Sequence, residues 1–202
     1  MEKKSVETQN NILEAARIIF AKKGLAGARM QEIADEAGIN KALLHYYYRS
    51  KEKLFEQVFE EALKKLLRPV SAFLSDDSDL FLKIQNLCRH YYTVLSEFPF
   101  LPNFVINEMN TDSSRLLKLM EIEGILAGKD KTIQQIKEAV QQGRIRDIDP
   151  RELVLNILSL CIFPFASRPI SGKLLYAEED IDEILRNRAD KVADFIIQSI
   201  KK

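Results

Sequence analysis

The feature that most constrains the fold is a pair of short helical segments joined at a glycine, within residues 33–51. Ile33 and Ala37 lie four residues apart, which places both side chains on one face of a helix. Gly38 follows and is the residue type that best tolerates a positive φ at a helix end. Asn40 is a favoured N-cap for a second helix. The spacing predicts a helix-turn-helix.

The second helix of this pair carries side chains that a protein surface rarely gathers unless they bind something. Leu44 and Tyr48 lie four residues apart and can anchor its back face in a core. The remaining side chains are left for the front face, which we expect to enter a DNA groove. They are Lys41, Ala42, Leu43, His45, Tyr46 and Tyr47.

Residues 8–55 resemble the N-terminal domain of the tetracycline-repressor (TetR) family. The matching segments are Ile12–Phe20, Lys23-Gly24, Ile33-Ala34, Ala37-Gly38-Ile39, Leu44, Tyr47-Tyr48 and Ser50–Leu54. The resemblance implies an all-α protein with an N-terminal three-helix, helix-turn-helix DNA-binding domain over residues 1–50. It also implies a larger C-terminal helical domain, residues 51–202, that binds a ligand and dimerises.

The same resemblance assigns DNA contacts to three places in the chain. Lys41 can donate to guanine, and Ala42 and Leu43 can pack on thymine methyl groups. His45, Tyr47 and Lys51 suit phosphate oxygens. The sequence departs from the family at Ala42, Leu43 and His45, where Gly, Thr and Tyr are common, so no operator sequence is implied. The predicted contacts are Arg29, Met30, Gln31, Lys41, Ala42, Leu43, His45, Tyr46, Tyr47 and Lys51.

The charge of the N-terminal segment, rather than that of the whole chain, supports a DNA-binding N-terminal domain. The 202-residue chain has 30 basic and 30 acidic residues, so it lacks the overall basic charge of many nucleic-acid-binding proteins. Residues 1–51 hold nine basic and six acidic residues, a balance of +3, which leaves −3 for residues 52–202. The sign of this asymmetry suits a DNA-facing N-terminus.

Helical periodicity continues along the whole chain, and no segment shows the alternation typical of a strand. Asp149, Pro150 and Glu152 form a strong helix start, because Asp caps, Pro fits the first turn and Glu lies three residues after the cap. Pro69 is expected to close the fourth helix. The predicted helices are 6–23, 29–37, 41–46, 51–67, 80–97, 103–109, 111–142 with breaks near Gly124 and Gly128, 150–163 and 180–200.

The resemblance implies a homodimer formed by the last two long helices, about 151–165 and 180–200. The helix from Leu153 is apolar on nearly all sides, so it needs cover. The resemblance also implies an apolar effector pocket, although packing within the core explains each aromatic residue at least as well. The candidate pocket residues are Tyr91, Tyr92, Phe98, Phe100, Phe104 and Phe163.

Catalytic and metal-binding patterns are missing from the sequence. The two histidines, His45 and His90, fall in different predicted domains, and no catalytic motif stands out, so we expect neither an enzyme nor a cofactor or metal. Cys88 and Cys161 lie in apolar helical surroundings and are expected to be buried, reduced thiols of a cytoplasmic protein. The longest uncharged run, 153–167, falls short of the ~20 residues of a membrane span.

The sequence therefore predicts a ligand-responsive transcriptional regulator, a repressor that releases a palindromic operator when a small apolar effector binds. Its expected partners are double-stranded DNA, the effector and a second copy of the chain. The alternative is a helical dimeric adaptor that responds to a protein partner and binds DNA weakly or without specificity. Leu43 and Ala28, which replaces the family's usual capping threonine, leave room for that alternative.

Overall fold

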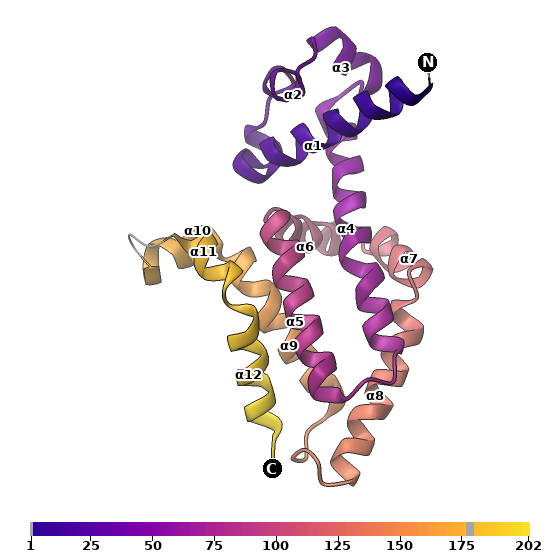
Figure 1. The fold of residues 1–202 in the computed structure, drawn as a ribbon, viewed down its shortest axis with the longest axis vertical. Coiled ribbons are helices and arrows are strands. Elements are labelled where there is room, and N and C mark those ends of the chain that lie inside the picture. Colours follow the sequence, from indigo (N-terminus) through magenta and orange to yellow (C-terminus); the bar gives the residue numbers. More distant parts are fainter. Residues whose placement is uncertain (1, 177–179) are drawn as a thin grey trace. The chain divides into compact units, whose positions relative to one another are not determined.

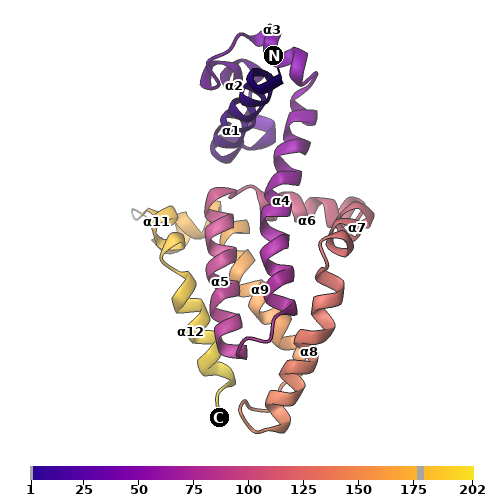
Figure 2. The same cartoon turned by 45° about the vertical axis from the view of Figure 1, so that its right-hand side comes forward.

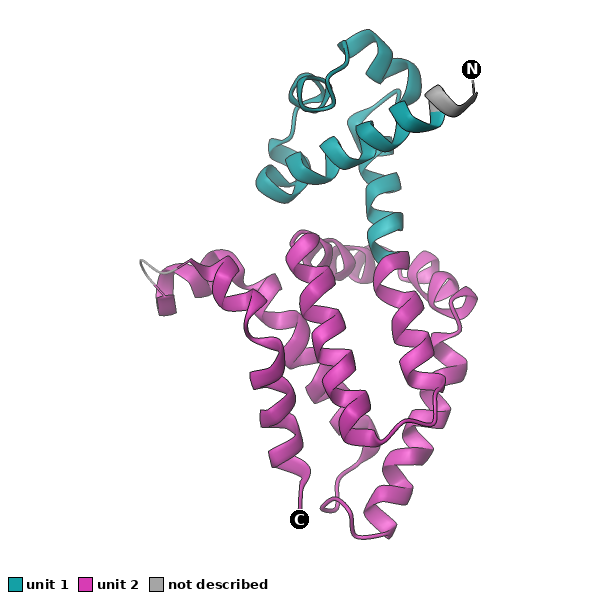
Figure 3. Ribbon diagram, viewed as in Figure 1, with its two compact units in different colours: residues 1–63 teal, residues 64–202 magenta. Residues whose placement is uncertain are grey.

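The computed structural model describes residues 2–176 and 180–202, and these residues are almost entirely helical (Figure 1). The one pairing of extended backbone recorded among them is an isolated bridge between Ile145 and Lys201. The chain divides into two compact units, Met1–Leu63 and Lys64–Lys202 (Figure 3). The predicted all-α class is confirmed. The functional division at residue 50 stays a prediction.

The first unit contains the predicted helix-turn-helix. Its buried side chains include Phe20 and Phe55, whose rings meet edge to face with centroids 4.9 Å apart. This contact joins the first helix to the fourth and closes the small core. The helices are α1 (Glu2–Gly27), α2 (Met30–Glu36), α3 (Lys41–Tyr47) and the first part of α4 (Lys51–Ser75). Helix α1 departs from helical geometry at Gly24, where the sequence predicts its end.

The prediction that helix α4 ends before Pro69 is wrong, because α4 continues through Pro69 to Ser75. Proline removes the N–H that would bond the carbonyl of Lys65, which normally weakens or kinks a helix. Apolar burial on both sides offsets this loss, since Leu66, Leu67 and Val70 are all at most 7% exposed. The tertiary packing of α4 therefore outweighs the local signal of the proline.

The second unit is built around α5, which packs against α9, α11 and α12. Figures 1 and 2 both show α12 beside α5. Asp149 caps α9 as predicted, because its side chain accepts a hydrogen bond of 2.8 Å from the Arg151 amide. The helices are α5 (Leu80–Glu97), α6 (Leu101–Thr111), α7 (Ser114–Ile122), α8 (Ile125–Gln141), α9 (Pro150–Ala166), α10 (Arg168–Ser171), the π-helix η1 (Gly172–Tyr176), α11 (Ile181–Arg186) and α12 (Ala189–Ile200).

Three predicted boundaries in this unit are wrong. Residues 168–172, expected to be a loop, form α10 and the first residue of η1. The predicted helix 180–200 is broken into α11 and α12. The break lies at Asn187, a poor helix former that follows α11, and at Arg188, the residue before α12. Both halves still pack on α5, so the break costs little burial. The long segment from 111 is interrupted at Gly124, as predicted, whereas Gly128 lies inside α8.

Candidate nucleic-acid interface

The turn between α2 and α3 has the backbone geometry that the sequence predicts. Gly38 adopts φ 67°, and the Ile39 amide donates to the Ala34 carbonyl at 3.0 Å. The Asn40 side chain then accepts from the Leu43 amide at 2.8 Å and caps α3. These bonds satisfy backbone groups at both helix ends, so the turn needs no further partner to hold its shape.

Helix α3 is held to the core by a small part of its surface. Leu44 is fully buried, and Tyr48, the residue that follows the helix, is 6% exposed. Tyr48 is therefore a core residue, as predicted, and burial raises the pKa of its hydroxyl. The other side chains of α3 are exposed, except Tyr47, which is half-buried.

The exposed surface of α3 combines aromatic, apolar and basic groups. Tyr46 is 81% exposed, and its ring meets that of Tyr47 edge to face with centroids 5.5 Å apart. Leu43 is 37% exposed. Residues 37–51 contain Lys41, two further basic residues and no acidic residue. The surface can thus offer hydrogen-bond donors, a phenol and a methyl-contacting side chain to a polyanion, with no carboxylate of its own to repel one.

The three predicted DNA-contacting side chains at the start of α2 differ in their exposure and in their hydrogen bonds within the protein. Arg29 is exposed, and its side chain does not cap α2. Met30 is half-buried. Gln31 is exposed, but its side-chain amide donates to Asp35 at 2.8 Å, so it would have to leave that carboxylate to reach DNA.

Lys51 has a structural contact that the sequence reasoning missed. Its Nζ donates to the backbone carbonyl of Ala28 at 3.1 Å, which places the first residue of α4 beside the start of α2. Ala28 is 2% exposed, so its carbonyl needs a partner within the protein. The sequence signal for this contact was Ala28 itself, which cannot cap a helix and lies in the short connection between two predicted helices. A phosphate contact of Lys51 stays a prediction.

The structure therefore brings the ten predicted residues into one compact unit. The Lys51–Ala28 bond joins the start of α4 to the neighbourhood of Arg29, and α2 packs directly on α3. The assignment of these residues to DNA contacts stays a prediction.

The six candidate pocket residues do not share one environment. Tyr91, Tyr92 and Phe98 are buried, Phe100 and Phe104 are half-buried, and Phe163 is 67% exposed. Phe98 and Phe100 meet edge to face at 6.1 Å. The Tyr92 hydroxyl donates to the carbonyl of Leu160 at 3.1 Å, and burial raises its pKa to about 12. For Tyr91 and Tyr92 the packing is that of a core, and the pocket assignment stays a prediction.

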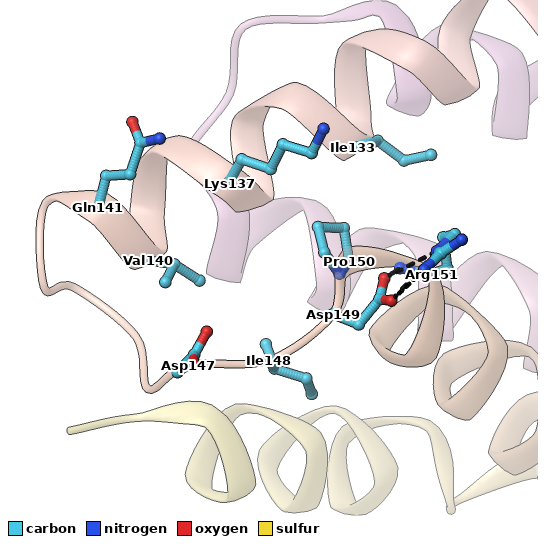
Figure 4. A pocket seen from close by; sticks show the side chains of 9 residues that line it. All are labelled: Ile133, Lys137, Val140, Gln141, Asp147, Ile148, Asp149, Pro150 and Arg151. Atoms are coloured by element: carbon cyan, nitrogen blue, oxygen red, sulfur yellow. Dashed lines mark hydrogen bonds and ion pairs between the residues drawn. The ribbon is translucent and has the colours of Figure 1, made fainter.

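A cavity of about 620 Å³ lies elsewhere in the second unit, between the end of α8 and the start of α9 (Figure 4). Its lining mixes apolar and charged groups, and the Arg151 guanidinium is paired with the Asp149 carboxylate at 3.0 Å. None of the six candidate pocket residues contributes to it. It is lined by Ile133, Lys137, Val140, Gln141, Asp147, Ile148, Asp149, Pro150 and Arg151.

Within residues 2–176 and 180–202, no three His, Cys, Asp or Glu side chains are grouped so that they could hold a metal ion. Across the same part of the chain, no single helix has the length and apolar character to cross a membrane. Helix α9 and the segment Arg168–Tyr176 pass that test only together, as a pair bent by 65° and judged by length and composition alone.

Comparison with known proteins shows what this arrangement is similar to. Residues 12–58 match the family model described as bacterial regulatory proteins, tetR family. The transcriptional regulator RutR of Escherichia coli is 32% identical over 147 residues, which cover 72% of this chain and 68% of RutR. The transcriptional repressor NicS of Pseudomonas putida is 28% identical over 163 residues, 80% of this chain and 77% of NicS.

The fold is also similar to that of solved structures. A transcriptional regulator of the TetR/AcrR family from Thermobifida fusca superposes with a TM-score of 0.64 and 16% identity, over 97% of this chain and 100% of that one. At this identity the likeness concerns the fold alone. It extends over both compact units.

Proposed function

Because this chain belongs to the TetR family and is a DNA-binding transcriptional regulator, we propose that it represses transcription and releases its operator when a small, mostly apolar effector binds. The observation that carries the DNA-binding part is the exposed face of α3, where Lys41, Leu43 and Tyr46 stand clear of the core without a carboxylate among them. The name of NicS, a repressor, supports the sign of the regulation.

Different residues of the exposed α3 face contact different parts of the DNA. Lys41 and Leu43 lie at the start of the helix, the end that reads base edges in a helix-turn-helix. His45 and Tyr47 lie at later positions and contact phosphates, which set the register of the protein on the duplex. Arg29 and Lys51 add donors from the neighbouring helix starts.

A palindromic operator requires a dimer, and we propose that α9 and α12 form it. Leu155 and Phe163 on α9 are 57% and 67% exposed, and Phe195 on α12 is 64% exposed. Large apolar side chains exposed on two helices that pack together are typical of a surface covered by a partner. Two recognition helices in such a dimer would meet half-sites about one helical turn, ~34–36 Å, apart or somewhat farther.

The effector acts by binding better to the conformation that does not fit the operator. Helix α4 carries residues of both compact units, so it is the element through which effector binding can alter operator affinity. Several polar contacts hold its C-terminal part within the second unit. They include Lys65–Glu97, the carbonyl of Leu66 with His90, and Arg68–Glu123.

The first test is selection of duplexes from random DNA by the full chain, followed by affinity measurements at several salt concentrations. We expect palindromic sites bound at least about 10³-fold more tightly than unrelated DNA, with log K falling linearly as log salt rises. Equal affinity for every sequence would favour the adaptor alternative. A compound screen by thermal shift then tests the effector, since a ligand that stabilises the protein should weaken operator binding.

A further inference from the structure

The two cysteines of the chain meet in the seam between α5 and α9. Cys88 on α5 and Cys161 on α9 are each fully buried, and their sulfur atoms are 3.7 Å apart although the residues lie 73 positions apart in sequence. A disulfide needs a sulfur–sulfur distance of about 2.05 Å, so each side chain would have to move by roughly 1 Å. Both thiols are free, and the chain contains no other cysteine.

The two thiols are not equivalent. The Cys161 thiol donates its hydrogen to the sulfur of Cys88. This hydrogen bond lowers the pKa of Cys88 against the opposing effect of burial, and the same bond, together with burial, raises the pKa of Cys161. Cys88 is therefore the sulfur better able to exist as a thiolate, which is the nucleophilic form of cysteine.

We propose that Cys88 and Cys161 are an oxidant-responsive pair that forms a reversible disulfide between α5 and α9. A hydroperoxide supplies the oxidation. The Cys88 thiolate attacks one oxygen of hydrogen peroxide, the oxygen–oxygen bond breaks, and the other oxygen leaves as hydroxide, which takes up a proton to become water. Cys88 is then a sulfenic acid. The Cys161 sulfur attacks the Cys88 sulfur, the new sulfur–sulfur bond forms as the sulfur–oxygen bond breaks, and the hydroxyl group leaves with the Cys161 proton as a second water.

The place of the pair gives this bond a structural consequence. Leu160, next to Cys161, accepts the hydrogen bond of Tyr92, and the Tyr92 ring packs against Phe165 with centroids 5.2 Å apart. The disulfide would therefore tie two helices at a seam that is already packed. The protein would then respond to an oxidant in addition to its effector. This response does not depend on the proposed effector or operator.

The test exposes the folded full chain to hydrogen peroxide, blocks the remaining thiols and measures intact mass and a non-reducing peptide map. We expect loss of two hydrogen atoms per chain, one peptide that joins Cys88 to Cys161, and full reversal by dithiothreitol. Burial should make the reaction slower than that of the unfolded chain in urea. Two free thiols after an exposure that fully oxidises the urea-unfolded chain would overturn the proposal, as would bonds formed only between chains.

Single variants test the roles of the two sulfurs. In Cys161→Ser a dimedone probe should trap a sulfenic acid at Cys88, whereas in Cys88→Ser the probe should label Cys161 much less. Equal labelling of both variants would contradict the assigned order of attack. The disulfide should also raise the thermal midpoint of the peroxide-treated protein above that of the untreated protein by on the order of 10 °C, because it closes a long loop in the unfolded chain. The peroxide-treated single variants should show no such rise, and a rise in them would contradict the proposal.

Discussion

Lys51 Nζ donates a hydrogen bond of 3.1 Å to the backbone carbonyl of Ala28. Through this contact the first residue of α4 holds the junction between α1 and α2, where the family's usual capping threonine is replaced. The lysine predicted to bind phosphate thus also supports the geometry of the start of α2.

Lys51→Met should separate these two roles. The methionine keeps most of the apolar stem and removes the donor, so we expect a loss of about 1 kcal/mol in the free energy of unfolding. Urea denaturation of the full chain measures it. Lys53→Met, at an exposed position of the same helix turn, should stay within about 0.5 kcal/mol of the original protein. If both variants are equally stable, the Ala28 bond has no energetic importance.

Asn40→Ala removes the side-chain cap of α3 and should destabilise the protein by about 1 kcal/mol. Thermal unfolding monitored by circular dichroism measures the change. Asn40→Asp keeps an oxygen at the capping position and serves as the control, with stability close to that of the original. An alanine variant as stable as the aspartate variant would show that the Asn40–Leu43 bond does not matter.

Tyr46→Ala should weaken specific operator binding by roughly 5- to 100-fold while leaving the thermal midpoint unchanged, since the side chain is 81% exposed. Fluorescence anisotropy with a selected duplex provides the measurement. Lys41→Ala should also weaken binding, more for the selected duplex than for unrelated DNA, because we assign Lys41 to a base edge.

Lys118→Ala is the matched control for Lys41→Ala, because Lys118 is an exposed lysine of α7 in the other unit. We expect it to leave both the affinity and the salt slope unchanged. Intact specific binding in both Lys41→Ala and Tyr46→Ala would remove α3 from the interface.

Gly128→Ala should destabilise the second unit by about 1–3 kcal/mol, because a Cβ there would lie 2.8 Å from Leu74 Cβ and 3.0 Å from Ser75 Oγ. Helix α8 can approach α4 this closely only because Gly128 has no side chain. Ala127→Ser, at the exposed neighbouring position, should be neutral within about 0.5 kcal/mol in the same denaturation assay. A stabilised Gly128→Ala protein would mean that the two helices can move apart without loss.

Asp149 should titrate far below an ordinary aspartate. Its hydrogen bonds with the Arg151 side chain and amide lower the pKa from 3.8 to about 2. A carboxyl group whose pKa is lower in the folded state stabilises the fold above the unfolded pKa, and this contribution is lost as pH falls from about 4 towards 2. NMR titration of the carboxyl carbon measures the value. In Arg151→Gln the pKa should rise towards 3.8, and an unchanged value would contradict the stated cause.

Several local features were predictable from the sequence because their causes are local. Gly38 and Asn40 take the turn and capping roles that their residue types favour, and Asp149 starts α9 as its motif indicates. Tyr48 is buried because it lies one helical turn from Leu44. In each case the information lies within about four residues of the feature, which is the range over which helix periodicity and capping operate.

Other features depended on residues far away in the sequence. Pro69 predicted the end of a helix, but the burial of its neighbours carries α4 onward to Ser75. The bond from Lys51 to Ala28 spans 23 positions, and the contact of Cys88 with Cys161 spans 73. No local pattern contains such a pairing, because it exists only once the helices have packed.

The sequence by itself therefore determined the helical class, the helix-turn-helix and the family, since these follow from periodicity, short-range capping and a contiguous motif. The tertiary structure decided which partners the buried polar and sulfur groups meet. Nothing in the local sequence around Tyr92 indicates that its hydroxyl donates to the carbonyl of Leu160. The physical reason is that a buried donor must find an acceptor, and only the packed helices decide which acceptor lies within reach.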